Sequence, residues 1–189
     1  MNFANKVTIF RILSTPFFIG TILYYNPQRD FLRYVALGIF ILAVLSDAID
    51  GYIARTKGQR TKAGSILDPL ADKILLSSAF ICIFTKTALV NELNLPLWVV
   101  LLVITRDVII ILGSAVIYIV KGTFESVPTA WGKFATALQM VSVASVLVKL
   151  QFSYYIWIVA AALTLISGVQ YIRGGLKILY VHENNRNTV

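Results

Sequence analysis

The sequence has few charged residues, a single cysteine and a single histidine. Charged residues make up 14% of the 189 residues, whereas a soluble domain of this size carries about 25%. Cys82 cannot form a disulfide within the chain, and no pairing of cysteine with histidine suggests a zinc site. Because almost no polar sequence is left to build a second domain, we expect one membrane domain over residues 1–189.

Long apolar runs replace the missing charge, and 58% of the residues are hydrophobic. Since a membrane-spanning helix needs roughly 20 mostly apolar residues, the pattern predicts an all-α integral membrane protein. We expect six transmembrane helices, with a short N-terminal interfacial segment at Met1–Lys6. The six predicted spans are Val7–Tyr25, Asp30–Arg55, Ser65–Thr85, Pro96–Val120, Pro128–Leu150 and Tyr154–Leu179.

The net charge of +8 could indicate nucleic acid binding or the orientation bias of basic residues in membrane proteins. We expect no nucleic acid partner, because no basic run with interleaved aromatic residues lies outside the apolar segments. With the N-terminus inside the cell, eleven basic residues face the cytoplasm and four face the other side. This bias predicts a multi-pass protein of the cytoplasmic membrane with both termini and the loop Thr56–Ala63 in the cytoplasm.

Four of the nine acidic residues are clustered in one short part of the chain. Asp47 and Asp50 have i,i+3 spacing, and Asp68 and Asp72 have i,i+4 spacing, so each pair lies on one face of its helix. The two predicted helices are antiparallel neighbours across the loop Thr56–Ala63, so we expect both pairs to converge near the cytoplasmic end of the bundle.

Four carboxylates this close cannot all remain ionised without a counter-charge. A site made only of carboxylates suits hard divalent cations, so Mg²⁺ or Mn²⁺ is expected, and such ions usually bind phosphate as well. The alternative is a structural role, in which the carboxylates pair with Arg55, Lys73 or Arg106 and glycines allow close helix packing. We favour function, because ionisable groups at membrane depth are costly.

The complete pattern resembles the signature of the CDP-alcohol phosphotransferase family. It reads Asp-x-x-Asp-Gly-x-x-Ala-Arg over residues 47–55, then eight residues, then Gly-x-x-x-Asp-x-x-x-Asp over residues 64–72. The length and the six-span layout are also similar to that family. The resemblance implies an enzyme that joins an alcohol to a CDP-activated lipid, with two metal ions per active site at the cytoplasmic side of a homodimer.

The resemblance also assigns roles to individual residues. Asp72 matches the family's proposed general base, which takes the proton of the acceptor hydroxyl before that oxygen attacks the lipid-side phosphorus and CMP leaves. The metal ligands would be Asp47, Asp50, Asp68 and Asp72, and the CDP-binding residues would be Asp47, Gly51, Ala54, Arg55 and Gly64.

Basic residues inside the predicted spans are candidates for binding an acceptor phosphate, and we name Arg11, Arg106 and Lys133. Lys133, Thr136 and Gln139 form a polar stripe on one helix face, and Arg106 could instead pair with Asp107. The stripe and the N-terminus are similar to the phosphatidylglycerophosphate synthases within the family, whose substrates are CDP-diacylglycerol and glycerol 3-phosphate.

Two alternatives stay open. Asp107 follows Arg106 where that subfamily commonly has Glu, and the Arg-Asp pair also looks like the CDP-diacylglycerol-dependent cardiolipin synthases, so phosphatidylglycerol, inositol phosphate or serine is a possible acceptor. From a different class, a small membrane transporter would also place carboxylates inside the membrane, but it would not need Gly51, Ala54, Arg55 and Gly64 at fixed spacing.

Overall fold

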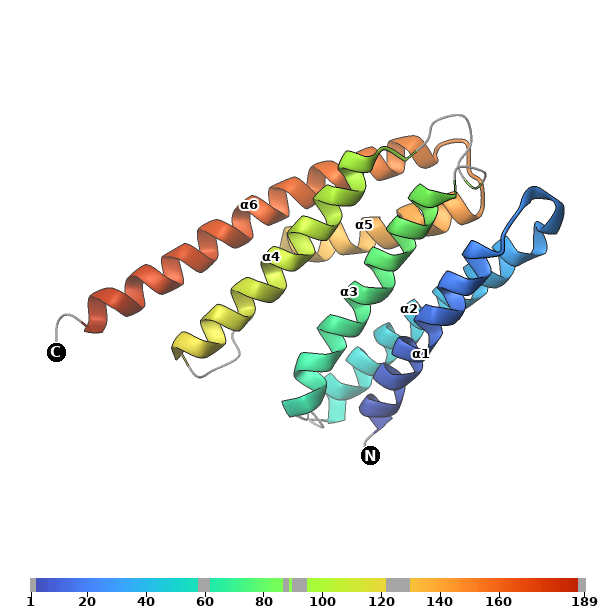
Figure 1. Cartoon of the computed structure of the whole chain (residues 1–189). Helices are drawn as coiled ribbons and strands as arrows, with labels where there is room; N and C mark the ends of the chain where they lie inside the picture. Colours follow the sequence, from blue (N-terminus) through green and yellow to red (C-terminus); the bar gives the residue numbers. More distant parts are fainter. Residues whose placement is uncertain (1–2, 58–61, 87–88, 90–94, 122–129, 187–189) are drawn as a thin grey trace.

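The computed structural model describes residues 3–57, 62–86, 89, 95–121 and 130–186, with side chains for 7–49, 71–86, 89, 95–117 and 130–175. In this described part the chain forms six α-helices and one short 3-10 turn, η1 (Figure 1). The helices are α1 (Phe3–Leu23), α2 (Phe31–Lys57), α3 (Lys62–Thr85), α4 (Leu97–Lys121), α5 (Ala130–Leu147) and α6 (Ser153–Arg186), and η1 covers Pro27–Arg29.

Each predicted span corresponds to one helix, which confirms the all-α fold. The predicted N-terminal interfacial segment is not separate from the first helix, because α1 runs unbroken from Phe3. At the other end of the chain, α6 continues to Arg186, beyond the predicted end at Leu179, and no proline lies in that stretch to stop it.

Three helices contain segments that are long and apolar enough to cross a membrane, namely Phe31–Ile49 in α2, Leu97–Ile117 in α4 and Ser153–Gly175 in α6. Val7–Leu23 of α1 forms a shorter apolar helix. Large apolar side chains are exposed over the described surface, including Phe17 at 69%. Because exposed apolar area of this extent marks contact with something other than water, the surface fits a bilayer. Crossing by all six helices stays a prediction.

The helices alternate in direction, so both termini lie towards one end of the bundle (Figure 1). α1 packs on both α2 and α3, while α6 packs on α4 and α5. The core between them is apolar, with Phe18 of α1 and Phe40 of α2 in contact at a ring-centroid distance of 5.9 Å.

The turns at the end of the bundle away from the termini are fixed by local hydrogen bonds. Asn26 caps η1 by accepting a hydrogen bond from the backbone nitrogen of Arg29 at 3.0 Å, and Pro27 occupies the first helical position. α5 ends at Leu147, and Lys149, two residues further on, has a φ of 59°. The amide of Leu150 donates to the carbonyl of Ser145 at 3.0 Å, the hydrogen bond of a left-handed helix cap.

Candidate active site

Two of the four carboxylates of the acidic cluster have described side chains, Asp47 on α2 and Asp72 on α3. Asp72 interacts electrostatically with Asp47 and with Arg11 of α1. Arg11 is 1% exposed and forms an ion pair and hydrogen bond with the Asp47 carboxylate. Three helices therefore bring one guanidinium and two carboxylates into one electrostatic cluster, and part of the Asp47 side chain, 41%, remains exposed.

Helices α2 and α3 both pack along α1, which links them. The direct approach of α2 to α3 that the sequence predicts stays a prediction. The sequence could not show the role of α1, because a short connection makes two helices antiparallel without fixing which other helix packs on both. This arrangement explains why Arg11, proposed from the sequence as an acceptor ligand, lies beside Asp47.

The remaining signature residues lie in helices, but their side chains are outside the described part of the structure. Gly51, Ala54 and Arg55 follow Asp50 in the last turns of α2, and Gly64 and Asp68 lie in the first turns of α3. Among the side chains that are described, no group of three or more acidic, histidine or cysteine residues is placed to hold a metal ion. The four-carboxylate metal site therefore stays a prediction.

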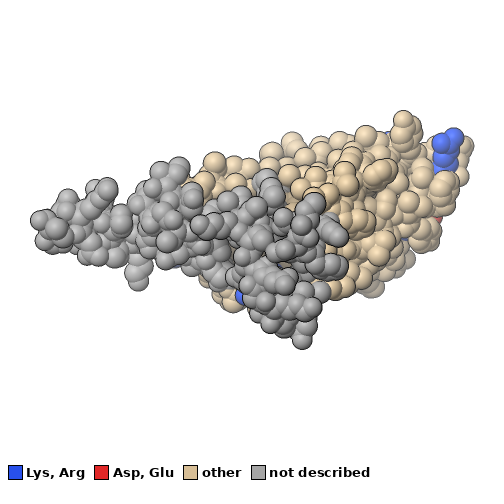
Figure 2. All heavy atoms as spheres, turned by 90° about the horizontal axis from the view of Figure 1, so that it is seen from below, with Lys and Arg blue, Asp and Glu red and all other residues tan. Residues whose placement is uncertain are grey.

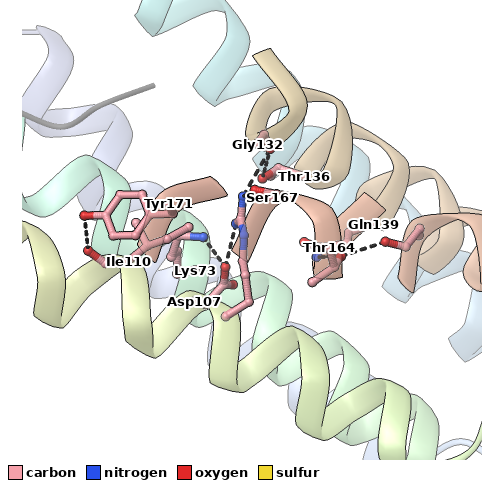
Figure 3. A network of polar contacts seen from close by, with 11 residues as sticks. Lys73, Asp107, Ile110, Gly132, Thr136, Gln139, Thr164, Ser167 and Tyr171 are labelled. Carbon is pink, nitrogen blue, oxygen red and sulfur yellow. Dashed lines mark hydrogen bonds and ion pairs between the residues drawn. The ribbon is translucent and has the colours of Figure 1, made fainter. Parts of the chain in front are cut away.

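A second charged cluster is centred on Asp107 of α4, whose side chain is 3% exposed (Figure 3). One carboxylate oxygen, Oδ1, accepts hydrogen bonds from Lys73 of α3 and from Nη1 of Arg106, the latter at 2.8 Å. Nη2 of Arg106 donates to the Ser167 hydroxyl at 3.0 Å and to the Gly132 carbonyl at 3.3 Å. The cluster thus joins α3, α4, α5 and α6.

The predicted polar stripe on α5 spreads across three environments. Gln139 is fully buried and donates to Thr164 of α6 at 2.7 Å. Thr136 is half-buried and donates to the Gly132 carbonyl at 3.0 Å, whereas Lys133 is exposed. The Gly132 carbonyl also accepts from Arg106, so the first turn of α5 lies against that guanidinium.

An apolar groove of about 380 Å³ lies between α4 and α6. Arg106 is the one charged residue among its walls, which otherwise are formed by side chains such as Trp98, Leu101 and Ile172. No lining residue is acidic, so the groove is not part of the carboxylate cluster, and its walls match hydrocarbon better than a polar ligand.

A sequence model of the CDP-alcohol phosphatidyltransferase family matches residues 1–166. The chain belongs to this family. It is similar to a probable phosphatidylglycerophosphate synthase of Mycobacterium tuberculosis, with 33% identity covering 93% of this chain and 82% of the relative. It is also similar to proteins named CDP-diacylglycerol–glycerol-3-phosphate 3-phosphatidyltransferase from two other bacteria. The Aquifex aeolicus protein is 31% identical, covering 95% of this chain and 99% of the relative. The Escherichia coli protein is 34% identical, covering 90% and 93%.

Membership of this phosphatidyltransferase family confirms the family prediction made from residues 47–72. One feature that sequence reasoning missed is the bond between Lys73 and Asp107. The available signal was the depth of Asp107 in an apolar helix, because a carboxylate there needs a cation.

Proposed function

We propose that this protein transfers a phosphatidyl group from CDP-diacylglycerol to glycerol 3-phosphate, giving phosphatidylglycerophosphate and CMP. The relatives that carry this name are 31% and 34% identical over nearly the whole chain. One structural observation supports the proposal most directly. Asp47 and Asp72 come from the two halves of the signature, and they lie in one electrostatic cluster with Arg11.

The donor set fits a hard divalent cation. The described members, Asp47 and Asp72, offer carboxylate oxygens, the donors that Mg²⁺ and Mn²⁺ prefer. In this proposal Asp47, Asp50, Asp68 and Asp72 hold two such ions per active site. When bound, the ions would neutralise negative charge on the pyrophosphate and on the attacking and leaving oxygens.

The chain's own residues supply the remaining chemistry in this proposal. Asp72 accepts the proton of the acceptor hydroxyl, whose oxygen then bonds to the lipid-side phosphorus while the bond to CMP breaks. The CDP moiety contacts Asp47, Gly51, Ala54, Arg55 and Gly64. Glycine and alanine leave room for a ligand at the helix backbone, and the Arg55 guanidinium matches phosphate oxygens with a planar set of donors.

Arg106 and Lys133 are the stronger candidates for the acceptor phosphate. Both belong to the neighbourhood of the first turn of α5, since Arg106 donates to Gly132. Arg11 is the weaker candidate, because it lies beside Asp47 of the proposed metal site and not at the first turn of α5.

The wider setting of the enzyme is also proposed. Six spans place the catalytic residues at the cytoplasmic side of the cell membrane, with both termini in the cytoplasm, in accord with the charge bias of the connecting segments. Arrangement as a homodimer is carried over from the family.

The acceptor test uses purified protein in detergent with CDP-diacylglycerol and Mg²⁺, offered each acceptor separately, with the lipid product identified. We expect phosphatidylglycerophosphate and CMP from glycerol 3-phosphate, and loss of both products with a chelator. Product only from phosphatidylglycerol would identify a cardiolipin synthase instead, and no CMP with any acceptor would favour the transporter.

A further inference from the structure

The cluster around Asp107 contains two cations and one carboxylate. The side chains of Lys73, Arg106 and Asp107 are 13%, 6% and 3% exposed, so water screens them little. Both cations bind the same oxygen, Oδ1 of Asp107 (Figure 3). Asp107 balances one of these two positive charges. Asp72 also interacts electrostatically with Lys73, but the proposed function commits Asp72 to the metal ions, so the metal-bound site needs a second counter-charge for its buried cations.

Two polar atoms of the same cluster are buried without a hydrogen-bond partner among the described residues. They are the Nε donor of Arg106 and the Oδ2 acceptor of Asp107. Buried polar groups are nearly always paired in folded proteins, so unpaired ones call for an explanation. A ligand that accepts hydrogen bonds and carries negative charge would satisfy the donor and balance the extra charge.

The shared oxygen also fixes the separation of the cations. Two nitrogens that each lie about 3 Å from one oxygen are at most roughly 6 Å apart, and a single phosphate group can accept from both. We propose that Lys73 is a phosphate-binding residue of the acceptor site, acting together with Arg106, and that Asp107 positions the two cations. This inference rests on the proposed function, since it names how that acceptor is held.

The position of Lys73 in the chain gives the proposal a geometric consequence. Lys73 directly follows Asp72 on α3, the two charged groups interact electrostatically, and Asp72 is the proposed base. A phosphate held by Lys73 lies close to the residue that takes the hydroxyl proton. The site thus suits an acceptor in which only a few bonds separate phosphate from hydroxyl.

The structure offers a matched control at the other end of the bundle. There Asp30 binds a buried arginine, Arg33, at 2.7 Å and lies 3.8 Å from the Lys149 ammonium. Arg33 donates to the carbonyl of Leu147 at the end of α5, whereas Arg106 contacts Gly132 at its start. Fifteen residues of helix separate the two contacts by about 22 Å, so Lys149→Met removes an equivalent lysine far from the proposed acceptor site.

The test compares Lys73→Met, Lys73→Arg and Lys149→Met in the purified enzyme. Lys73→Met should raise KM for glycerol 3-phosphate roughly 10- to 100-fold, the value of one hydrogen bond between charged groups. Its KM for CDP-diacylglycerol and its kcat at saturation should stay near wild type. Lys73→Arg should restore most of the lost affinity because it keeps the charge, and Lys149→Met should leave all three values unchanged.

Inhibition by inorganic phosphate separates binding from a purely structural role. If Lys73 contacts phosphate, its loss weakens competitive inhibition by phosphate and KM for glycerol 3-phosphate in parallel. Normal KM and normal phosphate inhibition in Lys73→Met would overturn the inference. If Lys73→Met also loses CDP-diacylglycerol binding, Lys73→Gln replaces it in the test. Glutamine keeps a hydrogen-bond donor without the charge, and the same changes in KM and in phosphate inhibition decide the outcome.

The proposed function can fail separately. If the wild-type enzyme gives no product from glycerol 3-phosphate, the acceptor assignment is wrong whatever Lys73 does. In that case the KM measurements are repeated with phosphatidylglycerol in mixed micelles as the acceptor. A raised KM for that lipid in Lys73→Met would support Lys73 as a ligand of a lipid phosphodiester, and an unchanged KM would overturn the inference for both sources of phosphate.

Discussion

Three arginines inside the helical bundle are almost fully buried, and each is bound to an aspartate. Arg11 pairs with Asp47, Arg106 with Asp107, and Arg33 with Asp30, and all three arginines are no more than 6% exposed. A guanidinium is charged at any accessible pH, so burial away from water requires a counter-charge. These pairs hold the helices in register, because each joins different elements or donates onward to one.

Among single residues, Asp72 gives the most specific prediction for activity. Asp72→Asn should abolish phosphatidyl transfer, because an amide cannot accept the hydroxyl proton, while CDP-diacylglycerol binding remains. The loss should be at least about 100-fold in kcat, the lower contribution of a positioned general base. Turnover and binding of the CDP-lipid are measured on the same preparation.

The matched control is Asp30→Asn, which makes the same chemical change at the opposite end of the bundle. It should retain turnover, although it weakens the ion pair with Arg33. If Asp72→Asn showed normal turnover, the base assignment would be wrong.

Lys133 tests the acceptor site from a second helix. Lys133→Ala should raise KM for glycerol 3-phosphate with little change in KM for CDP-diacylglycerol, because Lys133 is predicted to bind the phosphate of the acceptor only. A loss of one charge-assisted contact corresponds to roughly a tenfold change or more. An unchanged KM would favour the view that this exposed lysine is simply an interfacial residue.

At the scale of the helices, the contact between α4 and α6 depends on one glycine. A β-carbon added at Gly113 would lie 2.8 Å from Cε1 of the Tyr171 ring. The Tyr171 hydroxyl is hydrogen-bonded to Ser114 at 2.8 Å and to the Ile110 carbonyl at 3.0 Å. The hydroxyl end of the Tyr171 ring is therefore fixed by hydrogen bonds, and the ring occupies the space that a side chain at Gly113 would fill.

Gly113→Ala should consequently lower the thermal stability of the protein, because either the ring or α6 must move. In a Tyr171→Ala background the same substitution should be neutral or stabilising, since alanine favours helix by about 1 kcal/mol over glycine. The change of sign is measured by thermal unfolding in detergent. Gly38→Ala, where nothing lies within 4 Å of the added β-carbon, is the control and should stabilise. Equal destabilisation in both backgrounds would contradict the packing argument.

Helix α5 is fixed at both ends by arginines from other helices. Arg106 of α4 donates to its first turn at Gly132, and Arg33 of α2 donates to its last residue, Leu147, at 2.7 Å. Carbonyls at the end of a helix have no partner within it, so the second contact also caps α5. The position of Lys133 relative to Arg106 follows from this double attachment.

For the whole molecule, the described surface is dominated by uncharged residues. In the view of Figure 2 the described atoms are nearly all uncharged, and basic atoms gather at the end where α1 meets α2. Trp98 and Trp157, near the starts of α4 and α6, pack edge to face at 6.3 Å, with Tyr154 beside Trp157. Tryptophan and tyrosine concentrate at membrane interfaces, which is consistent with these helix starts lying at one.

The predicted orientation can be measured with thiol reagents that do not cross membranes. In a Cys82→Ser background, Gln28→Cys in η1 should be labelled from outside intact cells, because η1 is exposed and is predicted to face outward. Thr188→Cys near the C-terminus should be labelled only after the membrane is opened. The reverse pattern would invert the orientation and move the proposed active site to the outer face.

The sequence predicted the helices well because their causes are local. Apolar runs of sufficient length and turn residues such as Asn26 and Pro27 mark where helices begin and end, and the α2 and α3 boundaries came within three residues of the prediction. The signature over residues 47–72 likewise identified the family, because its spacing is a property of the chain itself.

The partners of the buried charged residues could not be predicted from the sequence in the same way. The sequence leaves open whether Arg106 pairs with Asp107. The two residues do pair, and the further bond from Lys73 depends on α3 lying against α4. Arg11 is one of the acceptor-phosphate candidates that the sequence offers, and it binds Asp47 because α1 packs on both α2 and α3. Such contacts join residues 34 and 36 positions apart, and no local pattern encodes them.

By itself, then, the sequence determined the membrane class, the helical elements and the identity of the catalytic family, since periodicity, composition and motif spacing act over a few turns of chain. Only the tertiary structure decided which cation meets which carboxylate. In an apolar environment that choice is made by whichever helices pack together, because a buried charge must bind the nearest opposite charge that the packing provides.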